Sequence, residues 1–219
     1  MNPELRITQL KVTGKRAVKR VQVELSDGRT LELDPELVVA HSLRSGEAVA
    51  EEALEALARE DEALRARRRL TGYLALRVKS TADARFYLQR AGFSEPAIEA
   101  ALAAAADRGL LDDRRFAESL VRTRLKVGGP QGPLRLLAEL VAHGIENDLA
   151  ESILAPQFDP EWQREAAEAA ARKRLGKQRL EEEMDRTDAI KKLYEYLKRQ
   201  GYEYEIALEA ADRAVKGRY

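Results

Sequence analysis

The chain has 219 residues, of which 44% are hydrophobic and 35% are charged, so it is long enough to bury a substantial core. Its 38 lysines and arginines balance 38 aspartates and glutamates, which excludes a general attraction to nucleic acid or to an acidic membrane. Cysteine is absent, which excludes disulfides and cysteine-ligated metals and is typical of a reducing cytosol. The sequence contains no apolar run of membrane-spanning length and no signal-peptide pattern, so we expect a cytoplasmic protein without a membrane partner.

The first part of the chain predicts a small antiparallel β unit. Apolar and polar residues alternate, with the period of half-buried strands, over residues 10–12, 21–25 and 31–33. Asp27-Gly28 favours a tight hairpin between the last two segments. A short helix is expected from Asp34-Pro35 to about His41, and a longer one from Glu47 to about Arg69. Five basic residues surround the first hairpin turn, and we interpret them as protection of an edge strand rather than as a phosphate-binding arm: Lys11, Lys15, Arg16, Lys19 and Arg20.

The remainder carries a segment that recurs three times, consisting of a Leu, three further residues, a Gly and an apolar residue. Its copies are residues 88–93, 140–145 and 197–202. A new amphipathic stretch follows each glycine at once, so Gly92, Gly144 and Gly201 are predicted to end helices in the left-handed conformation. Repeats of this length that carry only helical signal are typical of an elongated helical array.

We therefore predict a mainly α fold. It consists of three tandem three-helix repeats that form an elongated curved array, preceded by a small N-terminal β-hairpin and helix segment. The predicted boundaries are 1–66 for the N-terminal segment and 67–111, 112–157 and 158–219 for the three repeats. The middle helix of the third repeat is expected to be longer than its counterparts.

The joint between the first two repeats is the most specific motif in the chain. It reads Gly109-Leu110-Leu111-Asp112-Asp113-Arg114-Arg115-Phe116-Ala117. Together with residues 73–80 and with Gly132-Pro133 leading to Gly144-Ile145, this joint resembles the RecX family of recombinase regulators. The resemblance is strong over residues 70–154 and looser in the third repeat. The chain departs from the family pattern in the extra residues 128–131 and in Ala84, where the family often carries Leu.

The resemblance implies a regulatory protein that binds the RecA recombinase and the RecA–DNA filament. It implies that the protein lies in the helical groove of the filament and restrains ATP hydrolysis, strand exchange and filament extension, with roles in homologous recombination, DNA repair and SOS control. We expect a monomer that uses no cofactor and is not an enzyme. Direct contact with single- or double-stranded DNA stays open, and the alternative function is a sequence-nonspecific nucleic-acid-binding repeat protein that acts without RecA.

The residues of the joint are themselves interpreted as structural. Asp112 and Asp113 offer side-chain oxygens to the unsatisfied amides of the next helix start, after Leu111 ends an apolar face. Phe116 and Ala117 are predicted core residues, one large and one small. The two adjacent carboxylates lack the further oxygen ligands that a hard cation needs, and the two histidines, His41 and His143, have no partner at metal-ligand or triad spacing. We therefore predict no catalytic, cofactor or metal site.

Basic residues are concentrated in the first repeat. Between residues 65 and 92, eight basic residues face a single carboxylate, Asp83, which leaves a net charge of +7. The predicted contact residues for a partner protein or DNA are Arg67, Arg68, Arg69, Arg77, Lys79, Arg85 and Arg90, continued in the second repeat by Arg114, Arg115, Arg122, Arg124 and Arg135. The alternative is a solvated helix face whose arginines pair with the acidic residues at 47–62.

Overall fold

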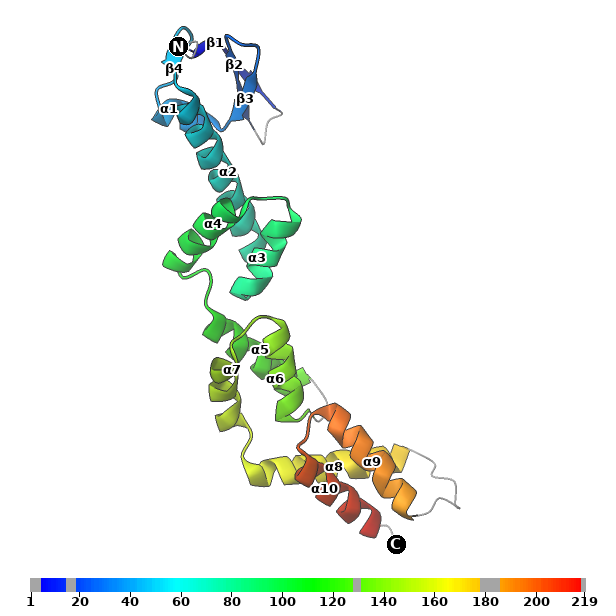
Figure 1. Cartoon of the computed structure of the whole chain (residues 1–219). Helices are drawn as coiled ribbons and strands as arrows, with labels where there is room; N and C mark the ends of the chain where they lie inside the picture. Colours follow the sequence, from blue (N-terminus) through cyan, green and yellow to red (C-terminus); the bar gives the residue numbers. More distant parts are fainter. Residues whose placement is uncertain (1–4, 15–18, 128–130, 178–185, 218–219) are drawn as a thin grey trace. The chain divides into compact units, whose positions relative to one another are not determined.

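The computed structural model describes residues 5–14, 19–127, 131–177 and 186–217 (Figure 1). It divides into two compact units. Unit 1 is Met1–Arg77 with Ala84–Leu111, and unit 2 is Val78–Asp83 with Asp112–Tyr219. The predicted mainly helical fold with an N-terminal strand segment is confirmed. Lys15, Arg16 and the Gly128-Gly129-Pro130 part of the inserted segment lie outside the described residues.

Unit 1 begins with an antiparallel sheet in the order β3-β2-β1-β4. Its strands are β1 (Leu5–Thr13), β2 (Arg20–Leu25), β3 (Thr30–Leu33) and β4 (Ala48–Val49). The predicted hairpin at Asp27-Gly28 is present, and Gly28 has a φ of 86°. The helix start expected at Glu47 is wrong, because residues 48–49 pair with Leu5 and Arg6 as β4 and the helix begins only at Glu51.

The edge-strand interpretation of the first basic group holds for Lys11 but not for Arg20. β4 pairs only with Leu5 and Arg6, so in the described sheet the half of β1 that carries Lys11 has a strand on one side only. Arg20 instead begins the inner strand β2, and its guanidinium contacts Asp61 of a helix that packs against the sheet. Arg20 and Asp61 lie 41 residues apart in the sequence, so no local pattern could indicate this contact.

Helix α2 (Glu51–Leu74) is shared by two hydrophobic cores of unit 1. Leu54 and Leu57 in its first half pack with the sheet, in the same cluster as Ile7, Val23 and Leu33. Ala66 and Leu70 in its second half pack in a separate cluster, which also contains residues from α3 (Thr81–Arg90) and α4 (Glu95–Asp107). The proposed boundary between residues 66 and 67 therefore falls inside one continuous helix.

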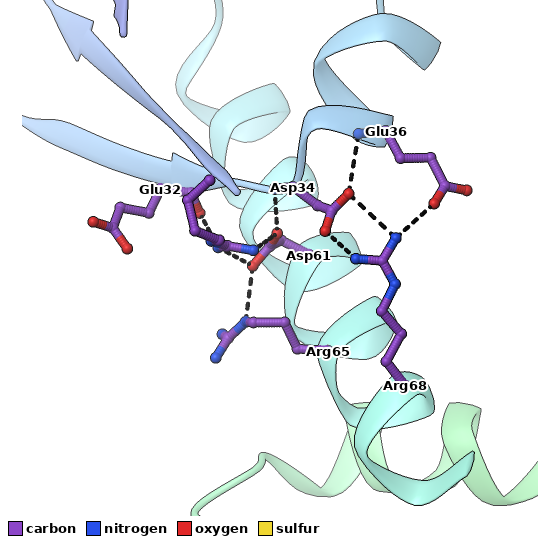
Figure 2. A network of polar contacts seen from close by, with 7 residues as sticks. Glu32, Asp34, Glu36, Asp61, Arg65 and Arg68 are labelled. Atoms are coloured by element: carbon purple, nitrogen blue, oxygen red, sulfur yellow. Dashed lines mark hydrogen bonds and ion pairs between the residues drawn. The ribbon is translucent and has the colours of Figure 1, made fainter. Parts of the chain in front are cut away.

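A partly buried polar network joins the sheet to α2, and Asp61 is at its centre (Figure 2). Asp61 is only 2% exposed. Its carboxylate accepts hydrogen bonds from both terminal nitrogens of Arg20 at 2.8 and 2.7 Å, from the Asp34 N–H at 2.8 Å and from Arg65 Nε at 2.9 Å. Burial by itself raises the pKa of Asp61, but the hydrogen bonds from Arg20 and Asp34 outweigh it, so the pKa lies below its usual value. The ionised carboxylate is thus the form that the folded unit holds.

Asp34 extends this network to the start of α1 (Pro35–Ala40). Its carboxylate accepts a hydrogen bond of 3.0 Å from the Glu36 N–H, as the predicted cap of this helix, and also pairs with Arg68 of α2. Arg68 lies 2.9 Å from the Glu36 carboxylate as well (Figure 2). One arginine of α2 therefore connects to both acidic residues at the start of α1.

Unit 2 contains two further three-helix groups, each with its own core. The first consists of α5 (Asp113–Val127), α6 (Pro133–Ala142) and α7 (Asn147–Leu154), followed by the 3-10 turn η1 (Ala155–Gln157). Its core includes Phe116, Leu136, Leu140 and Ile153. The second consists of α8 (Pro160–Lys177), α9 (Arg186–Gln200) and α10 (Tyr204–Lys216), with Leu193, Leu197 and Tyr202 in the core. As predicted, its middle helix is the longer one, with 15 residues in α9 against 10 in α6.

The recurring Leu-x-x-x-Gly-apolar segment is a helix-ending turn in all three places. Gly92, Gly144 and Gly201 have φ angles of 83°, 74° and 89°, which confirms the predicted left-handed conformation. The N–H of the apolar residue after each glycine donates to the carbonyl of the Leu five positions earlier, at 3.4, 3.1 and 3.2 Å. This is the hydrogen bond of a Schellman turn, and it explains why the Leu, the Gly and the apolar residue recur together.

Candidate partner-binding surface

Two of the predicted contact arginines in unit 1 are held by carboxylates of the same unit. Arg68 pairs with Asp34 and Glu36, as described above. Arg85 of α3 pairs with Glu95 and, at 2.5 Å, with Glu99, both on α4. Each of these arginines has two acidic partners within the unit, so its charge is largely compensated before any other molecule binds.

Two others lie over aromatic rings. The Arg69 guanidinium is 5.4 Å from the centre of the Tyr87 ring, and Tyr87 stacks on Tyr73 with a centroid separation of 4.0 Å and an interplanar angle of 6°. Arg90 lies 5.9 Å from the ring centre of Phe86, whose side chain is 61% exposed. A cation over an aromatic ring keeps its positive charge while the ring gives it a fixed position. Arg69 and Arg90 are therefore charged, ordered and on the surface.

The side chains of Arg67 and Arg77 are exposed and form no ion pair, hydrogen bond or ring contact with the described part of the chain. Arg67 lies on α2, and Arg77 lies just after its end. Lys79 differs from them, because it is half-buried and engaged within the chain. Among the predicted contact residues of unit 1, Arg67 and Arg77 therefore have the most charge available to a partner.

In unit 2, basic residues of α5 line a groove of about 550 Å³. Arg114, Arg122 and Lys126 belong to its lining, and Ser152 and Gln157 come from α7 and η1. Glu118 is the carboxylate among the described lining residues, and it lies 4.0 Å from Arg114. The lining therefore has an excess of two positive charges, which favours an anionic ligand or an acidic protein surface.

Two more of the predicted contact residues in unit 2 have internal partners. Arg124 lies 2.5 Å from the Glu139 carboxylate, and hydrogen bonding to Glu139 raises the pKa of Arg124. Arg135 donates a hydrogen bond of 3.2 Å to the Gln200 side chain. In contrast, the Arg115 and Arg122 side chains are exposed and have no ion pair or hydrogen bond with any residue described. We refer to Arg67, Arg77, Arg115 and Arg122 as the four open arginines.

Comparison with known proteins identifies the family. The family model of the second three-helix domain of RecX matches residues 112–154, which are α5 to α7. A protein named Regulatory protein RecX from Clostridium botulinum (strain Eklund 17B / Type B) is 28% identical over 210 residues, which cover 96% of each chain. Another of that name, from Mycobacterium sp. (strain KMS), is 32% identical over 145 residues, which cover 66% of this chain and 78% of the relative. The chain belongs to the RecX family.

The fold agrees with this assignment. A crystal structure of regulatory protein RecX matches with a TM-score of 0.68 at 22% identity and covers 95% of this chain and 99% of its own. A crystal structure of RecX from Lactobacillus salivarius matches with a TM-score of 0.59 at 22% identity, over 71% of this chain and 97% of its own. The three-helix repeats described above are therefore a fold that these RecX structures share.

The two aspartates of the RecX joint at 109–117 contact two different helices. Asp112 accepts a hydrogen bond of 2.9 Å from the Arg115 N–H and caps α5, as predicted. Asp113 instead accepts one of 2.7 Å from the Thr81 N–H, at the start of α3, so the expectation that both cap the next helix is wrong. Leu111, Phe116 and Ala117 are buried, at 7%, 7% and 0% exposure. The sequence could not indicate the Asp113 contact because Thr81 lies 32 residues earlier.

Sequence reasoning also missed the partner of His143. Its Nδ1 lies 3.0 Å from the Asp83 carboxylate, and its ring meets Phe116 edge-on at 5.2 Å. In the part of the chain that the structure describes, no three His, Cys, Asp or Glu side chains come together as metal ligands. None of the described helices has the length and apolarity required to span a membrane.

Proposed function

We propose that this RecX chain binds the RecA recombinase and the RecA–DNA filament and restrains ATP hydrolysis, strand exchange and filament extension. The observation that carries the proposal is that four of the predicted contact residues, the open arginines, have no internal partner in a chain without net charge. An exposed arginine with no internal partner keeps its charge and its five donors for the acidic groups of another molecule. The family resemblance supports RecA as that molecule. The proposal makes the chain a cytoplasmic monomer and a regulator rather than an enzyme.

The test is charge reversal at the open arginines, measured as inhibition of RecA-driven, DNA-dependent ATP hydrolysis. We predict that Arg67→Glu with Arg77→Glu, and separately Arg115→Glu with Arg122→Glu, raise the half-inhibitory concentration about tenfold at low salt. Melting temperatures should stay nearly unchanged, because exposed charges contribute only about 0 to 1 kcal/mol to folding. The difference from the natural chain should shrink as salt rises.

The matched control reverses two exposed arginines elsewhere, Arg44→Glu with Arg199→Glu, which gives the same change in net charge. Inhibition by this control should equal that of the natural chain. If both test pairs inhibit normally at low salt while folded, the open arginines are a solvated surface and the proposed contact is wrong. Arg85 is unsuitable for this test, because its reversal would also break its contacts with Glu95 and Glu99.

The second candidate function is nucleic-acid binding without RecA. The basic groove along α5 favours it, since Arg114, Arg122 and Lys126 could follow a phosphate backbone. The salt dependence of binding distinguishes RecA regulation from DNA binding without RecA, because binding to DNA releases counterions. Affinity for free DNA should fall steeply between low and physiological salt, whereas inhibition of RecA through a protein contact should persist. Co-sedimentation with RecA filaments and with bare DNA across a salt series gives both measurements.

A further inference from the structure

Unit 2 contains a second cavity whose character is opposite to that of the basic groove. It measures about 270 Å³ and lies among α6, the end of α7 with η1, the start of α8, and the turn before α10. Its walls are mainly apolar, formed by Pro133, Leu134, Leu137, Leu154, Ala155 and Phe158. Its polar lining residues are Glu151, Gln163 and Glu203, which bring acceptor oxygens and no positive charge.

One of these acceptors is buried without a donor. Gln163 is 8% exposed, and its Nε2 donates a hydrogen bond of 3.0 Å to the Phe158 carbonyl. Its Oε1 is buried and receives no hydrogen bond from any described residue. A buried acceptor in this state lacks the hydrogen bond that water would give it, so a donor that reaches it from the cavity gains an acceptor already removed from water.

The two carboxylates are also available. The side chains of Glu151 and Glu203 are exposed and form no ion pair or hydrogen bond with the described residues. Glu168 and Glu209 of the same unit differ, since each lies near two arginines. The cavity therefore combines apolar walls, two uncompensated negative charges and one buried acceptor.

We propose that this cavity binds an arginine side chain that a partner protein presents beside an apolar residue. The guanidinium has five donors and no acceptor, which matches a site with carboxylates and an amide oxygen, and the alkyl stem fits apolar walls. The cavity volume lies just below the roughly 300 Å³ at which pockets for drug-sized ligands begin, so it has room for one long side chain. Phosphate groups are excluded by the two carboxylates. This inference goes beyond the proposed function, because it requires neither RecA nor the open arginines.

The experiment is a titration of the full chain with the capped tripeptide acetyl-Leu-Arg-Leu-amide, followed by two-dimensional amide NMR. The reference probe is the same peptide with citrulline in place of arginine, which keeps the shape but removes the charge. We expect the arginine peptide to shift the amide signals of Leu137, Glu151 and Gln163, with an affinity about tenfold above that of the citrulline peptide. The double variant Glu151→Gln with Glu203→Gln should lower the affinity for the arginine peptide by a similar factor.

The control variant Glu165→Gln with Glu195→Gln changes two exposed carboxylates outside the cavity and should bind like the natural chain. Both double variants alter exposed side chains, and their amide spectra without peptide report whether the fold is intact. Equal binding of the citrulline peptide would overturn the proposal. So would an equal response of the same amides to spermidine, which would indicate a site for small cations rather than for a protein side chain. Absence of shifts at millimolar peptide would contradict the site altogether.

Discussion

Tyr202 is the residue at which the third repeat departs most clearly from the other two. Phe93 and Ile145 occupy the same position in the recurring segment, whereas Tyr202 buries a hydroxyl that receives no hydrogen bond from the described residues. Its side chain is 1% exposed. Burial, with a smaller effect of Tyr196, raises the pKa of Tyr202 to about 12. The folded repeat therefore holds the neutral form.

We predict that Tyr202→Phe raises the free energy of unfolding at neutral pH by roughly 1 kcal/mol, because it removes an unpaired buried hydroxyl. The natural chain should also lose stability as pH rises from about 10, where an unfolded tyrosine ionises, towards the raised value of the folded state. The variant should lack that part of the alkaline loss. Urea unfolding between neutral pH and about pH 12 measures both effects. Tyr204→Phe, which removes an exposed hydroxyl, is the control, and a variant less stable than the natural chain would contradict the prediction.

At the level of elements, the three helix-ending glycines have the same local geometry and different surroundings. A Cβ atom on Gly144 would overlap the Ala82 side chain, and one on Gly201 would overlap the backbone of Arg135. A Cβ on Gly92 would meet open space. All three glycines thus require the left-handed backbone conformation. Only Gly144 and Gly201 also lie close to the start of another helix.

We predict that replacement by alanine costs least at Gly92, more at Gly144 and most at Gly201. The left-handed conformation alone costs about 1 to 2 kcal/mol at each site. At Gly144, the overlap with the Ala82 side chain adds to this cost. The cost is largest at Gly201, because the Arg135 backbone can move even less than a side chain. Gly144→Val should be worse than Gly144→Ala, because β-branched residues are least able to adopt a positive φ. Urea unfolding followed by circular dichroism measures the order, and equal losses at Gly92 and Gly201 would contradict it.

At the level of the whole molecule, we expect the stability of the two units to depend differently on pH. Unit 1 contains the Asp61 network, in which the pKa of a buried carboxyl is held below its usual value. A group with a lowered pKa stabilises the fold fully above its unfolded value of about 3.9, and this stabilisation is lost as pH falls through the lowered value. Trp162, the single tryptophan, lies in unit 2, where it meets Phe158 edge-on at 5.3 Å. Its fluorescence therefore reports unit 2 alone.

We predict that acid unfolds unit 1 before unit 2. Below about pH 4, the helical signal in circular dichroism should fall before the Trp162 fluorescence changes. Asp61→Asn should cost about 3 kcal/mol at neutral pH, because it leaves the partly buried Arg20 without its charged partner, and should flatten the acid dependence of unit 1. Coincident transitions of the two signals in the natural chain would show that the units do not differ in this way.

Local pattern was sufficient to predict the class of fold and most of its elements. Strand alternation, the Asp-Gly hairpin, the helix-starting Asp34 and the recurring glycines each depend on neighbours within a few residues, and the structure places each of them as predicted. The RecX joint could also be recognised from the sequence, because it consists of nine consecutive residues. The domain boundaries and the role of the basic residues stay predictions.

Tertiary structure decided the ion pairs that join residues far apart in the sequence, such as those of Arg20, Arg68 and Arg85. The chain contains many arginines with a similar local sequence, yet Arg68 and Arg85 are held by two carboxylates each while Arg67 and Arg77 are not. These ion pairs join residues that only packing brings together, and Arg20 contacts Asp61, which lies 41 positions later in the sequence. The same holds for the acidic cavity, whose Glu151, Gln163 and Glu203 come from separate helices or turns. Sequence by itself determined the helices and turns through short-range backbone preferences, whereas the charge exposed on their surfaces depends on long-range contacts that only the folded units define.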